Sequence, residues 1–246
     1  MFNYLITIEY VGTDFVGWQY QKNGKSIQES IEKVFKKILK TKIKIIGAGR
    51  TDKGVHALGQ SANFKIINKI ENKKKFLSSV NFFLNKKLIS ILSLEEKKTE
   101  FSARFSAKER IYEYIIINRE GSLSINKEKA WHIKQKLDLN LMKKGARIIE
   151  GKHDFSAFRA SSCSSKSPIK KLNAVKIKKI GDKISILFKS RSFLQNQVRS
   201  MVGCLKYLSC KKWKLNFFKK VLISKNRKLC APPAPACGLY LKKIRY

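Results

Sequence analysis

The chain has 246 residues, and 43% of them are hydrophobic, which is enough for a core in one large domain or two small ones and excludes a disordered chain. Its 54 Lys and Arg residues against 17 Asp and Glu residues give a formal net charge of +37. Such a charge repels itself unless an acidic partner is near, and nucleic acid is the first candidate. Lysine is spread through every segment, however, so a compositional bias with solvated faces explains many single lysines equally well.

The cysteines and histidines show no pattern of a metal site. The five cysteines have neither C-x-x-C spacing nor a matching pair of histidines, and the three histidines are too scattered to form a ligand set. No apolar run approaches the length of a membrane span, and the first ten residues alternate like a strand rather than a signal peptide. We therefore expect a soluble, cytoplasmic protein with reduced thiols, without a metal and without contact to a membrane.

The first half of the chain predicts six elements. Residues 2–10 alternate between apolar and polar like a half-buried strand, and a glycine-punctuated loop follows. Ser26 can cap a helix in which apolar residues recur at helical spacing. The remaining predicted elements are a strand through Ile43 and Ile45, a strand over 58–66, a helix over 71–85 and a strand over 88–94. Their order is β-α-β-β-α-β.

The second half repeats this order of elements without a repeat of residues. The pattern predicts a strand over 110–118, a helix over 139–151, strands over 173–180 and 183–190, helices over 193–209 and 216–224, and a strand over 238–244. We therefore predict two α+β halves, one over residues 1–105 and the other over residues 106–246, divided in the polar segment near 100–109.

The segment "GAGRTDKGVHALGQ" at 47–60 allows two interpretations. Its glycines are spaced somewhat like those of a phosphate-binding loop, but such a loop opens a helix, and the residues after Gly54 alternate like a strand. A P-loop also fails, because no Gly-Lys-Ser/Thr triplet occurs. The other interpretation is a strand–turn–strand that presents Asp52. A lone Asp in such a turn usually does no more than cap it.

Five blocks of the sequence resemble the tRNA pseudouridine synthases of the A type, in the order of that family and along almost the whole chain. They are "EYVGTDFVGWQYQ", "GRTDKGVHALGQ", "FSARFSAKERIYEYII", "HDFSAFRA" and "SFLQNQVRSMVG". One departure is Val11, where the family often has an acidic residue. The resemblance implies two ferredoxin-like halves with antiparallel sheets flanking a central cleft, which agrees with the predicted order of elements.

The resemblance also implies the reaction and its residues. The family isomerises uridine to pseudouridine at positions 38, 39 and 40 of tRNA, in the anticodon arm, as a homodimer and without a cofactor. Asp52 matches its catalytic carboxylate, which acts either as a nucleophile or as a base toward the ribose. Arg199 matches the partner that forms an ion pair with this carboxylate, and Tyr112 matches the tyrosine that lies against the target base. Arg50 is expected to contact the RNA backbone or to fill the space that the extruded base leaves.

Simpler interpretations stand beside these. Arg199 could be a surface arginine, Tyr112 a core residue and Arg50 a plain phosphate contact. His56 reads as structural, and Trp18 is as consistent with packing as with RNA contact. A non-catalytic RNA-binding module, with the basic surface as its whole function, is the alternative class of protein, and an enzyme that modifies another RNA is the alternative within the same chemistry.

Overall fold

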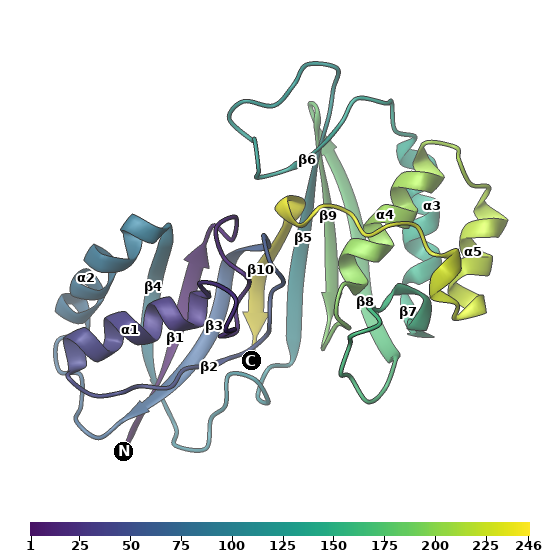
Figure 1. Ribbon diagram of the computed structural model, residues 1–246. Helices are drawn as coiled ribbons and strands as arrows, with labels where there is room; N and C mark the ends of the chain where they lie inside the picture. The colour runs from purple at the N-terminus through teal and green to yellow at the C-terminus, as the bar shows by residue number, and fades with distance from the viewer. The chain divides into compact units, whose positions relative to one another are not determined.

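The computed structural model describes residues 1–246, which fall into two units. The first unit is Met1–Lys108 together with Tyr240–Tyr246, and the second is Glu109–Leu239 (Figure 1). The division after Lys108 lies close to the boundary expected between residues 105 and 106. Residues 240–246, which we expected in the C-terminal half, pack instead with the N-terminal unit.

The first unit has the order of elements that the sequence predicts. It consists of β1 (Phe2–Tyr10), α1 (Ile27–Leu39), β2 (Ile46–Gly47), β3 (His56–Ile66), α2 (Lys73–Leu84) and β4 (Ile89–Lys97). β1 pairs antiparallel with both β3 and β4, and β2 pairs antiparallel with β3. The last strand of the chain, β10 (Leu239–Arg245), pairs in parallel with β3. That pairing connects residues far apart in sequence, which is why the periodicity of 238–244 did not reveal it.

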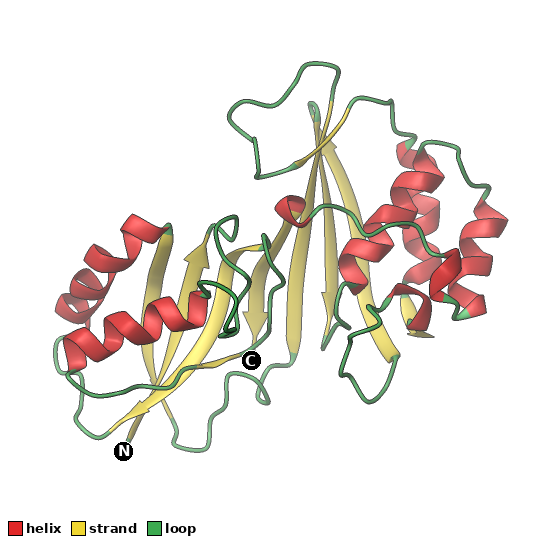
Figure 2. Cartoon of the chain, in the orientation of Figure 1, coloured by secondary structure: helices red, strands yellow, loops and turns green.

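Helices α1 and α2 cover one face of this sheet (Figure 2). Ser26 caps α1 by accepting a hydrogen bond from the backbone N–H of Glu29 at 3.2 Å, as the sequence predicted. The fully buried Phe35 contacts Phe64 of β3 with ring centroids 4.9 Å apart and Phe76 of α2 at 5.5 Å. Burying a side chain of this size contributes about 1.5–3 kcal/mol. The apolar face of α1 therefore joins both helices to the sheet.

The strand expected through Ile43 and Ile45 does not form at those residues. Both side chains are buried, but the strand covers only Ile46–Gly47. The backbone N–H of Ile45 donates to the carboxylate of Glu32 in α1 at 2.9 Å, so a side chain takes the hydrogen bond that a neighbouring strand would supply. Burial of the isoleucines was therefore predictable, whereas their backbone pairing was not.

The second unit is an antiparallel sheet with three helices. Its elements are β5 (Glu109–Asn118), β6 (Trp131–Ile133), α3 (Leu139–Ile149), β7 (Gly151–Asp154), β8 (Ile169–Ile180), β9 (Lys183–Ser190), α4 (Gln197–Ser209) and α5 (Leu215–Ser224). The antiparallel strands follow the order β5-β9-β8-β7, and β6 pairs in parallel with β5. The chain is thus an α+β protein, as predicted. None of its helices is both long and apolar enough to cross a membrane.

Two details of this unit differ from the sequence prediction. The strands β6 and β7 were not predicted, because runs of three and four residues are too short to show a period. The helix expected over 193–209 begins only at Gln197, because Asn196 has a left-handed backbone with φ of 61° that cannot continue an α-helix.

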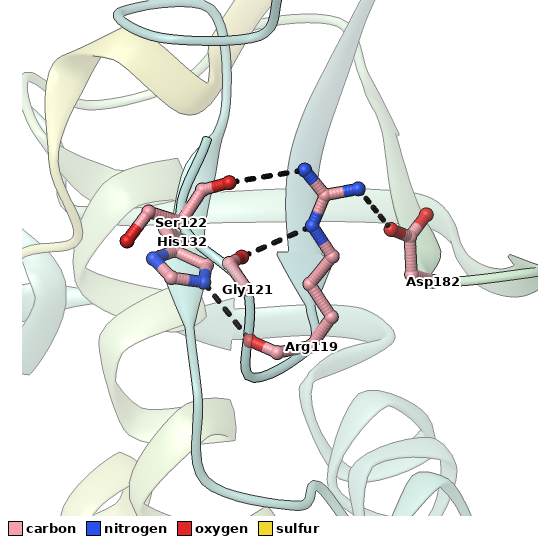
Figure 3. Close-up of polar contacts among 5 residues, drawn as sticks. All are labelled: Arg119, Gly121, Ser122, His132 and Asp182. Carbon is pink, nitrogen blue, oxygen red and sulfur yellow. Dashed lines mark hydrogen bonds and ion pairs between the residues drawn. The ribbon is translucent and has the colours of Figure 1, made fainter. Parts of the chain in front are cut away.

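The loop between β5 and β6 is folded around the side chain of Arg119 (Figure 3). Its guanidinium donates to the carbonyl groups of Gly121 and Ser122 at 3.1 and 3.2 Å and pairs with the carboxylate of Asp182 at 2.9 Å. The ring of His132 in β6 bonds the carbonyl of Arg119 at 2.9 Å. This arginine therefore holds its own loop together.

Candidate active site

Asp52 lies in a tight turn of the first unit, between β2 and β3. The N–H of Val55 donates to the carbonyl of Asp52 at 3.2 Å and closes the turn, while Gly54 supplies a positive φ of 76°. Asp52 forms an isolated β-bridge with Gly17, and the N–H of Trp18 donates to the carbonyl of Thr51 at 3.0 Å. Because the side chain of Asp52 is only half-buried, this turn presents it near the surface.

Two glycines let the loop after β1 lie directly against this turn. A Cβ atom on Gly12 would lie 2.0 Å from the carbonyl oxygen of Val55. Gly17 has a φ of +121°, and a Cβ atom there would lie 2.6 Å from the carbonyl oxygen of Thr51. Neither position accepts a side chain without movement of the backbone. Both glycines belong to the block "EYVGTDFVGWQYQ", which therefore packs against the turn of Asp52 in the block "GRTDKGVHALGQ".

Buried side chains also hold the turn of Asp52 in place by hydrogen bonds. The hydroxyl of Thr51, which is 6% exposed, shares a hydrogen bond with the hydroxyl of Tyr10 at 2.8 Å. His56 accepts the N–H of Gly12 on Nδ1 at 3.0 Å, and its buried ring stacks on Tyr240 with centroids 4.8 Å apart. The sequence indicated a structural role for His56, and these contacts support that role.

Trp18 and Arg50 have opposite environments. Trp18 is buried, packs against Tyr10 with ring centroids 6.1 Å apart, and lies where a Cβ atom on Gly47 would fall. Packing therefore explains this tryptophan. Arg50 is exposed, Thr51 is buried and Asp52 is half-buried. This alternation is expected in an extended chain, where successive side chains point to opposite sides.

Arg199 lies in the first turn of α4, in the second unit. Its Nε donates to the carbonyl of Ala234 at 2.7 Å, and its Nη1 donates to Oδ1 of Asn196 at 3.2 Å. The N–H of Ala234 donates in return to the carbonyl of Arg199 at 2.9 Å. A Cβ atom on Gly203 would lie 2.1 Å from the carbonyl oxygen of Pro232. The proline-rich segment 231–236 therefore runs directly along α4. The half-buried Arg199 is thus positioned by groups on both sides.

Tyr112 contacts the segment that precedes α4 in the second unit. It lies in β5 opposite Phe188 of β9, is 8% exposed, and its ring meets Phe193 edge to face with centroids 5.2 Å apart. Phe193 belongs to the segment that leads into α4. The structure therefore brings Tyr112 to the segment that carries Arg199.

Tyr114, on the same face of β5, connects this region to the proline-rich segment. Its hydroxyl donates to the carbonyl of Pro235 at 2.8 Å. Burial, and secondarily the charge of a Cys237 thiolate, raise the pKa of Tyr114 well above its ordinary value, while the positive charge of Arg199 acts in the opposite direction. The phenol therefore stays protonated and can donate its hydrogen bond, and the positive charge of Arg199 interacts electrostatically with it.

The candidate residues thus fall into two groups, one in each unit. One unit holds Asp52 and Arg50 in a single turn, and the other holds Tyr112 and Arg199 around the start of α4. The ion pair expected between Asp52 and Arg199 stays a prediction. Sequence reasoning missed Asn196 and Ala234 as partners of Arg199, and only the asparagine, next to the "QVR" segment, gave a local signal. No group of three or more His, Cys, Asp or Glu side chains is placed to hold a metal ion.

Known proteins match this chain over nearly its full length. A family model described as tRNA pseudouridine synthase matches residues 6–106 and 146–246. A tRNA pseudouridine synthase A from Pelagibacter ubique is 56% identical over 246 residues, which are 100% of both chains. Proteins of the same name from Neorickettsia sennetsu and Parvibaculum lavamentivorans are 42% and 41% identical over 243 residues, covering 99% of this chain and 99% and 98% of theirs. The chain belongs to the tRNA pseudouridine synthase family.

Proposed function

We propose that this protein isomerises uridine to pseudouridine at positions 38, 39 and 40 in the anticodon arm of tRNA, with Asp52 as the catalytic carboxylate and without a cofactor. The observation that carries the proposal is the turn of Asp52. Its backbone is fixed by Gly12, Gly17 and Thr51, and it presents a half-buried carboxylate near the surface. Membership of the family supplies the substrate class.

The reaction needs a carboxylate and no redox partner. The N1–C1′ glycosidic bond breaks, the uracil turns, a C5–C1′ bond forms, C5 loses its proton and N1 ends protonated, so the atoms of the nucleotide balance. Asp52 either attacks as a nucleophile or removes a proton from the ribose, and both roles require the ionised form. A neighbouring guanidinium favours that form.

Arg199 is proposed to supply this guanidinium. Ala234 and Asn196 hold its Nε and Nη1, which fixes the plane of the group before any substrate binds. A planar group held at two edges loses little further conformational entropy when it pairs with a carboxylate. These contacts support the proposal that Arg199 presents an already oriented guanidinium for an ion pair with Asp52.

Tyr112 and Arg50 are proposed to act on the RNA. The target uridine must leave its stack to reach a carboxylate, and an aromatic ring against the extruded base is worth about 1–3 kcal/mol. The edge-to-face contact with Phe193 fixes the ring of Tyr112 for this purpose. The exposed Arg50 is proposed to contact the backbone or to occupy the vacated space. The homodimer implied by the family resemblance and the cytoplasmic location expected from the sequence stay predictions.

The test uses tRNA transcripts with uridine labelled with tritium at C5 and present at only one of positions 38, 39 or 40. Wild-type protein is expected to release tritium from each transcript, because C5 loses its hydrogen when it bonds C1′. A transcript labelled only outside the anticodon arm should release none. Asp14→Asn, which removes an exposed carboxylate from the loop beside the turn, should leave the rates unchanged. Release from the outside label instead would favour another RNA position as the substrate.

A further inference from the structure

Helix α5 has one buried face and one open face. Phe218, Val221 and Leu222 are buried on the first. On the other, two adjoining hollows of about 460 and 380 Å³ share Asn216 and Lys220 and run along the helix. We call this surface the α5 groove. It is lined by Lys212, Trp213, Lys214, Asn216, Phe217, Lys219, Lys220, Ile223 and Ser224.

The floor of the α5 groove is aromatic. The rings of Trp213 and Phe217 lie with centroids 5.0 Å apart, and Trp213 continues to Tyr207 of α4 at 5.1 Å. The ammonium groups of Lys206 and Lys212 lie 5.5 and 5.2 Å from the centre of the Tyr207 ring. Aromatic rings interleaved with lysines in this way are typical of surfaces that bind unpaired nucleotides.

The rim of the groove is basic without compensation. No Asp or Glu occurs after Asp182, so neither α4, α5 nor the turn between them carries an acidic side chain. No groove lysine forms an ion pair, whereas Lys225, just beyond α5, lies 3.9 Å from the carboxylate of Asp154. A concentrated positive charge over an apolar floor attracts a polyanion that has flat apolar faces.

We propose that the α5 groove binds RNA of the tRNA substrate, with a base on the Trp213–Phe217 floor and phosphates at the lysines. Nothing in the candidate active site uses these residues. A second copy of this chain that met the first through the same surface is disfavoured as the occupant, because its α4 and α5 have no acidic side chain to pair with the groove lysines. The proposal rests on tRNA as the substrate.

The test compares two triple variants of equal charge change in binding and turnover of full-length tRNA. Lys212→Ala/Lys214→Ala/Lys220→Ala, the rim variant, removes three of the four lysines that line the groove, and Lys176→Ala/Lys178→Ala/Lys179→Ala removes three exposed lysines of β8. The rim variant should weaken binding and raise KM about 10-fold or more, leave kcat at saturating tRNA unchanged, and make the salt dependence of log K shallower by about 2. The β8 variant should change each quantity far less. Equal losses in both variants, or none in the rim variant, would overturn the proposal.

A second variant tests the floor separately. Trp213→Ala should weaken tRNA binding by at least about 5-fold, and Trp213→Phe should restore most of it, because the phenylalanine ring still stacks. Equal binding by Trp213→Ala and wild type contradicts the stacked base. If Trp213→Ala fails to fold, the rim and β8 lysine variants still test whether the α5 groove binds tRNA. If wild type binds through the rim but releases no tritium, the isomerase proposal fails while the groove stands.

Discussion

The turn of Asp52 and the loop of Arg119 place a charged side chain between two strands in different ways. The Asp52 turn is fixed by backbone hydrogen bonds, by the close approach of Gly12 and Gly17, and by the buried Thr51. The Arg119 loop is fixed by the charged group itself, which bonds two carbonyl groups and the carboxylate of Asp182 (Figure 3).

In the first case neighbouring residues fix the turn, and in the second the charged side chain itself fixes the loop. At Asp52, backbone hydrogen bonds and buried neighbouring residues fix the turn, and the half-buried carboxylate lies near the surface. At Arg119, the charge is the structural contact, and the ion pair is exposed, with side chains 45% and 39% accessible. Changes in the buried support should therefore alter stability and activity strongly, and changes in the exposed pair should alter them little.

Gly12→Ala tests the rigid support and should have the largest effect on stability. The added Cβ atom meets the backbone oxygen of Val55 at 2.0 Å, so the loop must move and the turn of Asp52 must move with it. We expect a loss of about 3 kcal/mol or more in urea unfolding, together with loss of tritium release. The matched control is Gly181→Ala, which has a φ of 58° but open space around it, and which should cost about 1 kcal/mol. Similar costs at both positions would refute the close-contact argument.

Asn196→Gly tests whether the support of Arg199 acts in the same way. Glycine keeps the left-handed backbone at φ 61° but removes the acceptor of Arg199 Nη1. Losing this hydrogen bond to a charged group should lower kcat about 10-fold and leave KM nearly unchanged. Asn196→Ala should show the same loss of kcat with an added loss of about 1 kcal/mol in stability. A change confined to stability in both variants would show that Asn196 has only a structural role.

Cys204 in α4 and Cys230 form a pair in which neighbouring groups set the reactivity of a thiol. Sγ of Cys204 lies 3.3 Å from Sγ of Cys230, and both thiols are free. The hydrogen bond from Cys204, and then the charge of Arg227, lower the pKa of Cys230 despite its burial, whereas the same hydrogen bond and burial raise the pKa of Cys204. Because a lowered pKa leaves thiolate at lower pH, Cys230 should react with iodoacetamide at a lower pH than Cys204.

Variants of the pair sharpen this expectation. Cys204→Ala removes the hydrogen bond, so alkylation of Cys230 near neutral pH should slow several-fold when each thiol is followed by peptide mass spectrometry. Cys210→Ala is the matched control and should leave the rate at Cys230 unchanged. A rate at Cys230 that is insensitive to Cys204→Ala would contradict the assigned cause.

Arg119→Ala should have the smallest effect. The exposed ion pair with Asp182 is expected to contribute less than about 1 kcal/mol to the free energy of unfolding, and tritium release should stay at the wild-type rate. A double-mutant cycle with Asp182→Asn isolates the pair. A coupling energy well above this value would remove the distinction between the two loops.

The sequence predicted those parts that depend on local pattern. The strand 2–10, the helix capped by Ser26 and the turn of Asp52 all appear where expected, because period, cap and glycine spacing are short-range signals. Leu194, Val198 and Met201 recur at helical spacing within the predicted helix over 193–209, and all three are buried.

The parts that the sequence did not predict depend on contacts distant in the chain. Ala234 binds Arg199 from 35 residues away, and β10 pairs with β3 although Tyr240 and its partner His56 lie far apart in the sequence. Asn196 is local, but its left-handed backbone has no counterpart in hydrophobic periodicity. Helical spacing continued through 193–196, so the predicted start of the helix was wrong.

The central claim is that Asp52 performs the isomerisation on a turn that the rest of the protein holds in place. The most direct measurement is single-turnover tritium release from C5-labelled tRNA by Asp52→Asn, with tRNA binding measured on the same preparation. We predict release at least about 10³-fold slower than wild type, with binding within a few-fold and an unchanged unfolding midpoint. Release at the wild-type rate by a folded Asp52→Asn protein that binds tRNA would contradict the account.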